Sequence, residues 1–408
     1  MKLKHIDMDQ FPVVQNELQI GGIGVSRLAS RVGTTPFYAY DRQLISERVD
    51  LLRQVLPERL HLHFAIKANP MPAVVQHLSH IIDGFDIASA GEMKTALDTP
   101  MPANRISFAG PGKTVQELKQ AIASNVIINV ESENELKCID KLAELMGSIP
   151  CIAIRVNPNY KITSSGMKMG SGPMQFGIDE EDLPRVLSSL DKYNVNFHGL
   201  HIFWGSQNLN EKAIQQAQTK TFQLALKLAE YCPTPIKLLN IGGGLGIPYF
   251  PGEQRLKLEP IADNLNYLLE NFRSERPETT VATELGRYIV GEAGIYVCKI
   301  VDRKKSRGQT FLITDGGLHH HLAATGNFGQ VLRKNFPVGI GNKMAHHIKE
   351  SVKVVGPLCT PLDLLADKAE LPQGEIGDLI VIFQSGAYGY SASPRLFLSH
   401  PECPEILV

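Results

Sequence analysis

The stretch NVIINVESENELKCIDKLAELMGSIPCIAIRVN, residues 125–157, decides the fold. It opens with an apolar, β-branched run at 125–130, continues at 132–146 with the spacing of an amphipathic helix, and returns to an apolar run at 151–157. A strand, a helix and a second strand in this order form a βαβ unit, whose two strands run parallel. The sequence therefore predicts a parallel sheet covered by helices.

The same alternation repeats on both sides of this stretch. Further apolar runs with strand character lie at 61–66, 84–89, 105–110, 197–203, 237–243 and 279–284. Polar segments with helical spacing separate these runs. Eight such units in about 240 residues favour a closed (β/α)8 barrel of the TIM type over an open sheet, so the predicted fold class is α/β.

After residue 284 the pattern changes to short strands joined by turns, as in TFLITDGG and GDLIVIFQSGAY. This pattern predicts a second, mostly antiparallel β domain. The first 40 residues lead into TTPFYAYD at 34–41, which we expect to add a strand to that domain. We therefore assign residues 42–282 to the barrel, and residues 1–41 together with 283–408 to the β-rich domain.

Composition and charge narrow the range of functions. The 408 residues include 41 Lys and Arg against 42 Asp and Glu. Nucleic acid is not expected as a partner, because surfaces that follow a phosphate backbone need an excess of positive charge. No apolar run has the length of a secretory signal or a membrane span, and the six cysteines contain no CxxC pair. We expect a cytoplasmic protein with mostly buried thiols.

Two groups suited to catalysis or binding follow predicted barrel strands, at the end where catalytic groups of such barrels gather. Lys67 comes directly after the strand at 61–66 and shares its inward face with His63 and Ala65. Most lysines are solvated, but one partly removed from water has a lowered pKa and attacks carbonyl groups. The glycines at 242–244 let backbone N–H groups approach an anion.

Glu284 ends the eighth predicted strand, and Arg287 follows it. One interpretation is a structural ion pair at the barrel rim. In the other, Arg287 helps to hold a phosphate while Glu284 faces a ring nitrogen inside the barrel. A lysine for an aldehyde, glycines for a phosphate and a carboxylate for a pyridine nitrogen together match pyridoxal 5'-phosphate.

A series of motifs in sequence order then resembles a known family, the fold-type III pyridoxal-phosphate decarboxylases, which include ornithine and diaminopimelate decarboxylases. The motifs are YAYD at 38–41, the Lys67 segment, FDIAS at 85–89, RVNP at 155–158, FGI at 176–178, GS at 205–206, the glycine run, ELGR at 284–287, GPLC at 356–359 and GAY at 386–388. The resemblance covers nearly the whole chain and implies a decarboxylase.

The resemblance also implies residue roles. Lys67 would form the Schiff base with the cofactor, and Glu284 would keep the pyridine nitrogen protonated. The other implied cofactor contacts are Asp86, Arg155, Phe203, Ser206, Gly242, Gly243, Gly244, Arg287 and Tyr388. Cys359 resembles the cysteine that a second subunit brings to the site to reprotonate the product carbon. The resemblance therefore implies a homodimer with shared active sites.

The sequence departs from ornithine and diaminopimelate decarboxylases at two positions. Phe203 replaces a histidine that stacks on the cofactor ring, and His201 on the same face is either a partial substitute or a hydrogen-bonded core histidine. Thr360 replaces the acidic residue that binds the distal ammonium of a diamino substrate. Thr360 and Asp363 are the candidate substrate contacts, and we expect free diamino acids to be poor substrates.

Two further segments differ from those relatives. His319, His320 and His321 stand where diaminopimelate decarboxylases have a stretch with an arginine. Consecutive side chains diverge, so we expect no metal there. The Gly-, Ser- and Met-rich insertion at 161–173 is either a surface loop or a lid for a bulky substrate.

Together these departures resemble a subgroup found beside exopolysaccharide and exosortase genes, and a decarboxylase that acts on glutamate tethered to an acyl carrier protein. A tethered substrate would explain the missing site for a distal charge. The alternatives are a decarboxylase of a free diamino acid, an amino-acid racemase on the same fold, a non-catalytic relative, and a Schiff-base aldolase without the cofactor. Glu284 argues against the racemase, because racemases of this fold type place an arginine there.

Overall fold

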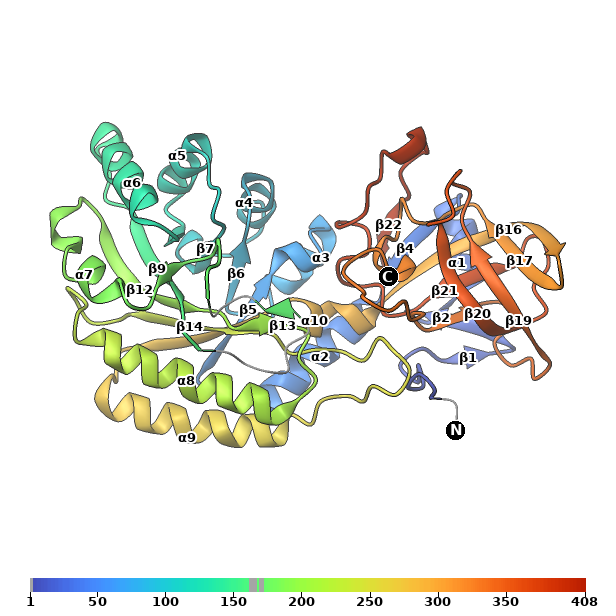
Figure 1. The fold of residues 1–408 in the computed structure, drawn as a ribbon, viewed down its shortest axis with the longest axis horizontal. Helices are drawn as coiled ribbons and strands as arrows, with labels where there is room; N and C mark the ends of the chain where they lie inside the picture. Colours follow the sequence, from blue (N-terminus) through green and yellow to red (C-terminus); the bar gives the residue numbers. More distant parts are fainter. Residues whose placement is uncertain (1–2, 161–166, 169–171) are drawn as a thin grey trace. The chain divides into compact units, whose positions relative to one another are not determined.

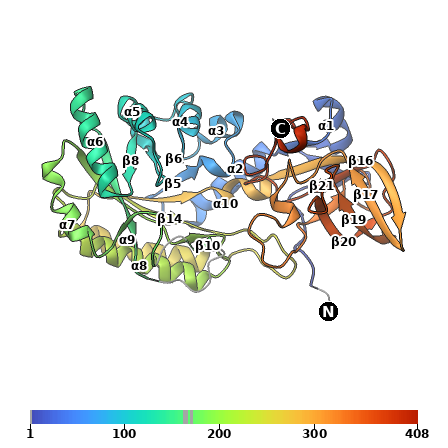
Figure 2. The same ribbon diagram turned by 45° about the horizontal axis from the view of Figure 1, so that its top comes forward.

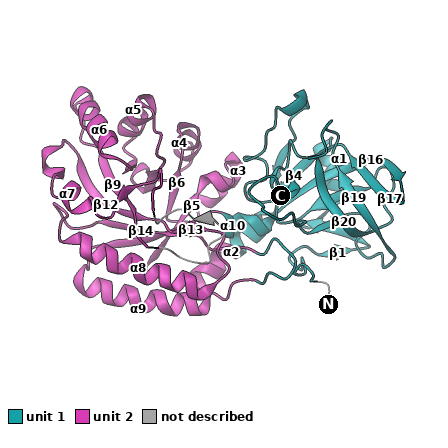
Figure 3. Ribbon diagram, viewed as in Figure 1, with its two compact units in different colours: residues 1–47, 248–254, 287–408 teal, residues 48–247, 255–286 magenta. Residues whose placement is uncertain are grey.

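The structure is a computed structural model that describes residues 3–160, 167–168 and 172–408. The chain divides into two compact units (Figure 3). The first unit in this description, magenta and labelled unit 2 in Figure 3, consists of residues 48–247 and 255–286. The second, teal and labelled unit 1, consists of residues 1–47, 248–254 and 287–408. The second unit is therefore built from segments that precede, interrupt and follow the first.

Eight parallel strands form the centre of the first unit. They are β5 (Leu60–Ala65), β6 (Gly84–Ile87), β7 (Ile106–Phe108), β8 (Ile127–Val130), β9 (Cys151–Asn157), β12 (Asn196–Ile202), β14 (Leu238–Gly243) and β15 (Thr280–Leu285). Each strand pairs with the next, and β15 pairs with β5, so the sheet closes on itself. A short strand, β11 (Ile178–Asp179), adds alongside β9. The predicted barrel is confirmed, and each predicted strand overlaps one of the eight.

Helices surround this barrel. They are α2 (Arg42–Val55), α3 (Pro72–Leu78), α4 (Ala90–Leu97), α5 (Val115–Ser124), α6 (Glu133–Met146), α7 (Leu183–Leu187), α8 (Glu211–Ala229) and α9 (Glu259–Glu275). Figures 1 and 2 show α3, α4, α5 and α6 following one another around the strands, with α8 and α9 packed together. The helix starts are encoded locally, because Ser89, Thr114 and Ser132 each accept a backbone N–H at the first turn.

The barrel interior changes from apolar to polar along the strands. Ile127, Ala153, Leu238 and Ala282 form a buried apolar cluster. Side chains two residues apart on a strand share a face, so the next inward residues on these four strands are Asn129, Arg155, Asn240 and Glu284, all of them buried. Buried polar groups need partners, and the second set therefore fixes the geometry of the carboxyl end of the barrel.

The second unit is a mixed, mostly antiparallel sheet. Its strands are β4 (Phe37–Tyr40), β16 (Gly294–Ser306), β17 (Gln309–Thr314), β18 (Val338–Ile340), β19 (Lys349–Val355), β20 (Leu364–Pro372), β21 (Leu379–Ile382) and β22 (Glu405–Leu407). Only β17–β19 and β4–β22 pair in parallel. The structure thus confirms the predicted β-rich addition to the barrel.

Smaller elements complete the second unit. A meander of β1 (Val13–Val14), β2 (Glu17–Ile20) and β3 (Ile23–Gly24) leads into α1 (Val25–Val32), and α10 (Arg287–Val290) follows the last barrel strand. Apolar residues of β2, α1, β4, β16 and β21 form one buried core. Among the described residues, no helix combines the length and the apolar character needed to span a lipid bilayer.

Candidate functional site at the carboxyl end of the barrel

Lys67 lies just beyond the first barrel strand. Strand β5 ends at Ala65, and Lys67 is in a 3-10 turn, η1 (Ile66–Ala68), that the following Asn-Pro sequence terminates. Its neighbours Ile66 and Ala68 are buried, whereas the lysine side chain is exposed. The 3-10 turn breaks the strand alternation from which the inward position was predicted, so that position stays a prediction, and the side chain is exposed.

The Lys67 amine nevertheless lies near two predicted site residues. Its Nζ is 5.8 Å from the centre of the Phe203 ring, and Phe203 is itself buried. The amine also interacts electrostatically with the carboxylate of Glu284. The structure thus gathers the predicted nucleophile, the aromatic ring and the acid within the barrel unit.

Glu284 is buried at the end of β15, beside a histidine and an amide. His201 Nε2 lies 3.3 Å from Glu284 Oε2, and Asn240 Nδ2 donates to the same oxygen at 3.3 Å. Burial alone would raise the pKa of Glu284, but the charges of His201, Lys67 and Arg155 outweigh it and lower the pKa to about 2. Glu284 is therefore an ionised carboxylate at neutral pH.

Asp86, on β6, is the second buried carboxylate of this end. Ser107 Oγ donates to Asp86 Oδ1 at 2.8 Å, and Asn240 Nδ2 reaches the same oxygen at 3.4 Å. His63 Nδ1 lies 3.5 Å from the other oxygen, Oδ2. Asp86 was predicted, whereas Asn240 and His63 were not assigned to the site. The sequence signal for both was their inward position on predicted strands.

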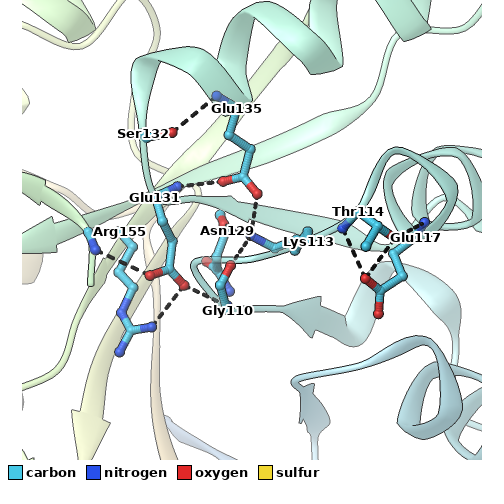
Figure 4. Close-up of polar contacts among 10 residues, drawn as sticks. Gly110, Lys113, Thr114, Glu117, Asn129, Glu131, Ser132, Glu135 and Arg155 are labelled. Carbon is cyan, nitrogen blue, oxygen red and sulfur yellow. Dashed lines mark hydrogen bonds and ion pairs between the residues drawn. The ribbon is translucent and has the colours of Figure 1, made fainter. Parts of the chain in front are cut away.

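Arg155 is held by a glutamate that the sequence analysis missed (Figure 4). Glu131 Oε1 accepts hydrogen bonds from Arg155 Nη1 at 2.8 Å and from Gly110 N at 2.5 Å, while Oε2 accepts from Gly177 N at 3.2 Å. The guanidinium also lies 4.8 Å from the centre of the Phe176 ring. Glu131 is 5% and Arg155 6% exposed, so this is a buried, fully engaged ion pair.

A buried lysine supports the loops beside this pair, as Figure 4 also shows. Lys113 Nζ donates to Glu135 Oε1, to Gly110 O and to Asn129 O, at 2.7–2.8 Å. The second oxygen of Glu135 accepts from the backbone N–H of Glu131 at 2.7 Å. Lys113 thus joins the loop after β7 to the start of α6 and keeps the Glu131 backbone in place.

Removing Glu131 is expected to destabilise the barrel. E131A leaves the Arg155 guanidinium buried without its counter-ion, which costs about 3–5 kcal/mol of unfolding free energy. Denaturant unfolding of wild type and variant measures this difference. The control is E133Q, which breaks the exposed Glu133–Arg185 pair and should leave the unfolding free energy nearly unchanged. Equal losses in both variants would contradict this assignment.

The glycine run adopts a backbone that other residues cannot follow. Gly242 and Gly244 have φ values of +70° and +88°. A Cβ at Gly244 would stand 2.2 Å from the Gly205 carbonyl oxygen, and one at Gly243 would stand 1.8 Å from the Glu284 carbonyl oxygen. The Gly242 N–H is directed by Asn240, whose Oδ1 accepts it at 2.8 Å.

Ser206 belongs to a short strand next to this run. That strand, β13 (Gly205–Ser206), pairs antiparallel with β10 (Met167–Lys168). Most of the 161–173 insertion, residues 161–166 and 169–171, lies outside the described residues. The choice between a surface loop and a lid therefore stays a prediction.

Arg287 and Tyr388 lie in the second unit. Arg287 Nη1 donates to the Tyr249 hydroxyl at 2.9 Å, and its guanidinium is 4.6 Å from the centre of the Tyr388 ring. Burial alone would lower the pKa of Arg287, but the two tyrosines outweigh it and raise the pKa. Arg287 is therefore a cation fixed between two aromatic side chains, and Tyr249 is a further residue that sequence reasoning did not select.

Cys359, Thr360 and Asp363 share the loop between β19 and β20. Cys359 is exposed, and Asp363 is buried. The two oxygens of Asp363 accept the backbone N–H groups of Leu318, at 2.6 Å, and Leu358, at 2.8 Å. These contacts indicate that Asp363 holds the loop in place, rather than contacting the substrate as predicted. Thr360 stays a candidate substrate contact.

The three consecutive histidines have separate partners. His320 Nε2 lies 2.8 Å from the Pro401 carbonyl oxygen, and His321 Nε2 lies 2.9 Å from the Ser385 hydroxyl. His319 is buried against the rings of His320 and His400. Burial lowers the pKa of His319 and of His321 to about 3, so both are neutral at physiological pH.

Comparison with known proteins gives consistent matches over most of the chain. Residues 42–291 match the family model described as pyridoxal-dependent decarboxylase, pyridoxal binding domain. The L-glutamyl-(BtrI acyl-carrier protein) decarboxylase of Niallia circulans is 36% identical over 91% of this chain and 88% of its own length. The diaminopimelate decarboxylase of Aquifex aeolicus is 33% identical over 96% and 90%, respectively.

A solved structure gives the same result for the fold. The crystal structure of diaminopimelate decarboxylase from M. jannaschii superposes with a TM-score of 0.88 at 26% identity, over 98% of this chain and 92% of that one. The barrel, the buried acid beside the lysine turn and the glycine run agree with these matches. The chain belongs to the pyridoxal-dependent decarboxylases of fold type III, and its cofactor is pyridoxal 5'-phosphate.

Proposed function

We propose that this chain removes the α-carboxylate of an amino-acyl group tethered to a carrier protein, with a glutamyl group as the first candidate. The observation that carries the decarboxylase chemistry is the ionised, buried Glu284 beside Lys67. The tethered substrate is supported by the neutral Thr360 and by the 36% identity to a decarboxylase of a carrier-bound glutamyl group.

The barrel residues fit pyridoxal 5'-phosphate. Buried polar atoms without a hydrogen-bond partner gather at its carboxyl end: His63 Nδ1, Asp86 Oδ2 and His201 Nδ1. The backbone at Gly242 and Gly244 leaves no room for side chains, as a close approach of N–H groups to a phosphate requires. A lowered pKa at Glu284 matches a protonated ring nitrogen.

When bound, the cofactor supplies an electron sink for the pair released as the bond between Cα and the carboxylate breaks. Lys67 would hold the cofactor through its aldehyde carbon. Glu284 keeps a proton on the ring nitrogen, since a nearby negative charge favours the charged form. Phe203 covers a ring face without adding a titratable group.

The other predicted contacts divide between the two units. In the barrel, we propose that Ser206 and the glycine run at 242–244 bind the phosphate, with the Gly242 N–H itself donated to Asn240 Oδ1. Asp86 and Arg155 complete the charge around the ring. From the second unit, we propose that Arg287 and Tyr388 contact the phosphate. His201 acts through Glu284, to which it is adjacent, rather than as a stacking group. These assignments rest on the domain boundaries predicted above, a cofactor-binding barrel at 42–282 and a β-rich domain at 1–41 and 283–408. We propose that the β-rich domain contributes residues to the site.

We further propose a homodimer in which Cys359 of one copy protonates the product carbon at the barrel of the other. The Cys359 loop carries the exposed Leu362, and the neighbouring loop carries Phe328, Val331 and Leu332, with Val331 98% exposed. Asn327 Nδ2 ties the two loops together through the Leu362 carbonyl oxygen at 3.3 Å. Exposed apolar side chains around an exposed thiol support a subunit interface there.

We expect the enzyme to work in the cytoplasm. All six cysteines lie in the described part of the chain and are free thiols, as in a reducing compartment. A role in exopolysaccharide biosynthesis stays a prediction.

The test is carbon dioxide release from a substrate panel of L-glutamyl carrier protein, free L-glutamate, meso-diaminopimelate, L-lysine and L-ornithine. We expect kcat/KM for the carrier-bound glutamyl group to exceed that of free glutamate by about 100-fold, because remote binding energy lowers the barrier. Equal values for the two forms would refute the tethered substrate. Conversion of L-amino acid to its D-form without carbon dioxide release would favour a racemase instead.

A variant tests the substrate assignment from the other direction. T360D restores an acidic residue beside Cys359 and should raise kcat/KM for L-lysine and L-ornithine about tenfold, through a charge-assisted hydrogen bond to the distal ammonium. T360V removes the hydroxyl without adding charge and serves as the matched control. If T360D and T360V behave alike, Thr360 does not face the distal end of the substrate.

A further inference from the structure

Asn240 occupies a central position in the barrel that no role described so far explains. It lies on β14, is 3% exposed, and uses both ends of its amide. Its Nδ2 lies 3.3 Å from Glu284 Oε2 and 3.4 Å from Asp86 Oδ1. Its Oδ1 accepts the Gly242 N–H at 2.8 Å. A single side chain thus joins two buried carboxylates to the first residue of the glycine run.

The amide is suited to this position because it is an uncharged group that donates at one end and accepts at the other. Two carboxylates close together in a buried site repel each other, and a shared donor between them reduces that repulsion. A carboxylate in place of the amide would add a third negative charge to Asp86 and Glu284. An aliphatic side chain would leave the carboxylates and the Gly242 N–H without this partner.

Two histidines and two basic side chains surround the set. His201 on β12 faces Glu284, His63 on β5 faces Asp86, and Lys67 and Arg155 act on Glu284 electrostatically. Ser107 donates to the Asp86 oxygen that Asn240 also reaches. The protonation of both carboxylates therefore depends on how they are held relative to these groups.

We propose that Asn240 is a positioning residue that sets the distance between the two ends of the cofactor site: the carboxylate for the ring nitrogen and the backbone N–H groups for the phosphate. The proposal rests on the pyridoxal-phosphate site described under the proposed function. It assigns no new chemical step, since Asn240 acts through Glu284 and through Gly242.

Two substitutions separate the two ends. N240D keeps an oxygen for the Gly242 N–H but loses the donor to the carboxylates, whereas N240A loses both. The matched control is N264D, the same chemical change at an asparagine of α9 outside this network, whose Nδ2 donates to Gln218 Oε1 at 2.9 Å. The first readout is the absorbance of each holoenzyme at about 420 nm between pH 5 and pH 9. The second is the affinity of each apoprotein for pyridoxal 5'-phosphate and for pyridoxal.

We expect N240D to add a pH-dependent step to the absorbance, because three carboxylates in one site share protons and one has a strongly raised pKa. Its preference for pyridoxal 5'-phosphate over pyridoxal should stay within about twofold of wild type. In N240A, the preference for pyridoxal 5'-phosphate over pyridoxal should fall by about three- to tenfold, the value of one hydrogen bond. Its absorbance should show no new pH-dependent step. N264D should change neither readout in this way.

Failure of this proposal is distinct from failure of the proposed function. If wild type binds no pyridoxal 5'-phosphate, the proposed function falls. If wild type binds it and both Asn240 variants match its absorbance profile and its preference, the positioning role is refuted. A step of equal size in N264D would refute it as well, since the effect would then belong to any added charge in the barrel unit. Should N240A fail to fold, N240D and N264D alone decide the outcome.

Discussion

K67A is expected to lose the absorbance band at about 420 nm and to reduce kcat by about a thousandfold or more, because Lys67 is the proposed source of the amine that holds the cofactor aldehyde. In the turn Ile66–Ala68, the Lys67 side chain is exposed, while both neighbours are buried. The measurements are the spectrum of the purified protein and carbon dioxide release.

The control for this prediction is K94A. Lys94 is an exposed lysine on α4 that pairs with Asp98 at 2.8 Å, so its removal should keep the band and the rate. Borohydride reduction followed by peptide mapping locates the bonded lysine directly. A reduced adduct on any lysine other than Lys67 would overturn the assignment, whatever the effect of K67A on the rate.

E284Q is expected to lower kcat by about 100-fold or more, because an amide cannot hold a proton on the ring nitrogen as a buried carboxylate does. The pKa of Glu284 lies at about 2, so the wild-type carboxylate stays ionised from pH 5 to pH 9. Any acidic limb in the wild-type pH–rate profile must then come from another group. Between pH 5 and pH 9, the absorbance of the cofactor bound to E284Q should depend on pH more steeply than that of the cofactor bound to wild type.

The same substitution has a consequence for stability against acid. A carboxyl group whose pKa falls from 4.5 to about 2 on folding stabilises the protein above pH 4.5, and that contribution is lost as the pH falls towards 2. E284Q lacks this group and should therefore lose less stability than wild type between pH 4.5 and pH 2. Denaturant unfolding at a series of pH values measures both proteins.

Glu92 provides the matched acidic control. It also interacts electrostatically with Lys67, but its carboxylate accepts the Ala88 N–H at 2.7 Å at the start of α4 and is not placed beside Asn240 and His201. E92Q should keep kcat within about threefold, the effect of a single modest interaction. A loss in E92Q as large as that in E284Q would show that net charge near the lysine, and not the ring nitrogen contact, limits the rate.

The sequence predicted the barrel because its evidence is local and repeated. Each strand is a short apolar run, and the alternation of side chains places Glu284 on the inward face whatever the other strands do. Ser89, Thr114 and Ser132 mark helix starts in the same local way. Ordered motifs added the lysine and the glycines, which the structure brings together with Glu284 in the barrel unit.

The partnerships within the barrel could not be predicted in this way. Glu131 meets Arg155 because β8 pairs with β9 in one particular register, and Asn240 reaches both Glu284 and Asp86 across the closed barrel. Both depend on contacts between residues far apart in sequence. The turn at Lys67 was missed for a different reason, since one 3-10 step at the end of a strand leaves the apolar pattern unchanged.

Asp363 shows a third reason why a residue's role could not be predicted from the sequence. Its sequence neighbour Cys359 suggested a contact with substrate, but its oxygens bind two backbone N–H groups from separate loops. Loop residues of this kind take their roles from the packing of distant turns, and no periodic pattern reports it.

The two strands that pair with β4 are translated long after β4 itself. This strand of four buried residues, Phe37–Tyr40, precedes all eight barrel strands in the chain, yet one of its neighbours is β16 and the other is β22, which ends at Leu407. All eight barrel strands precede both neighbours in translation, so the barrel has the chance to close while β4 still has two open edges. A nascent chain stalled before residue 405 would keep one edge of β4 uncovered, and that edge would be open to pairing with another chain.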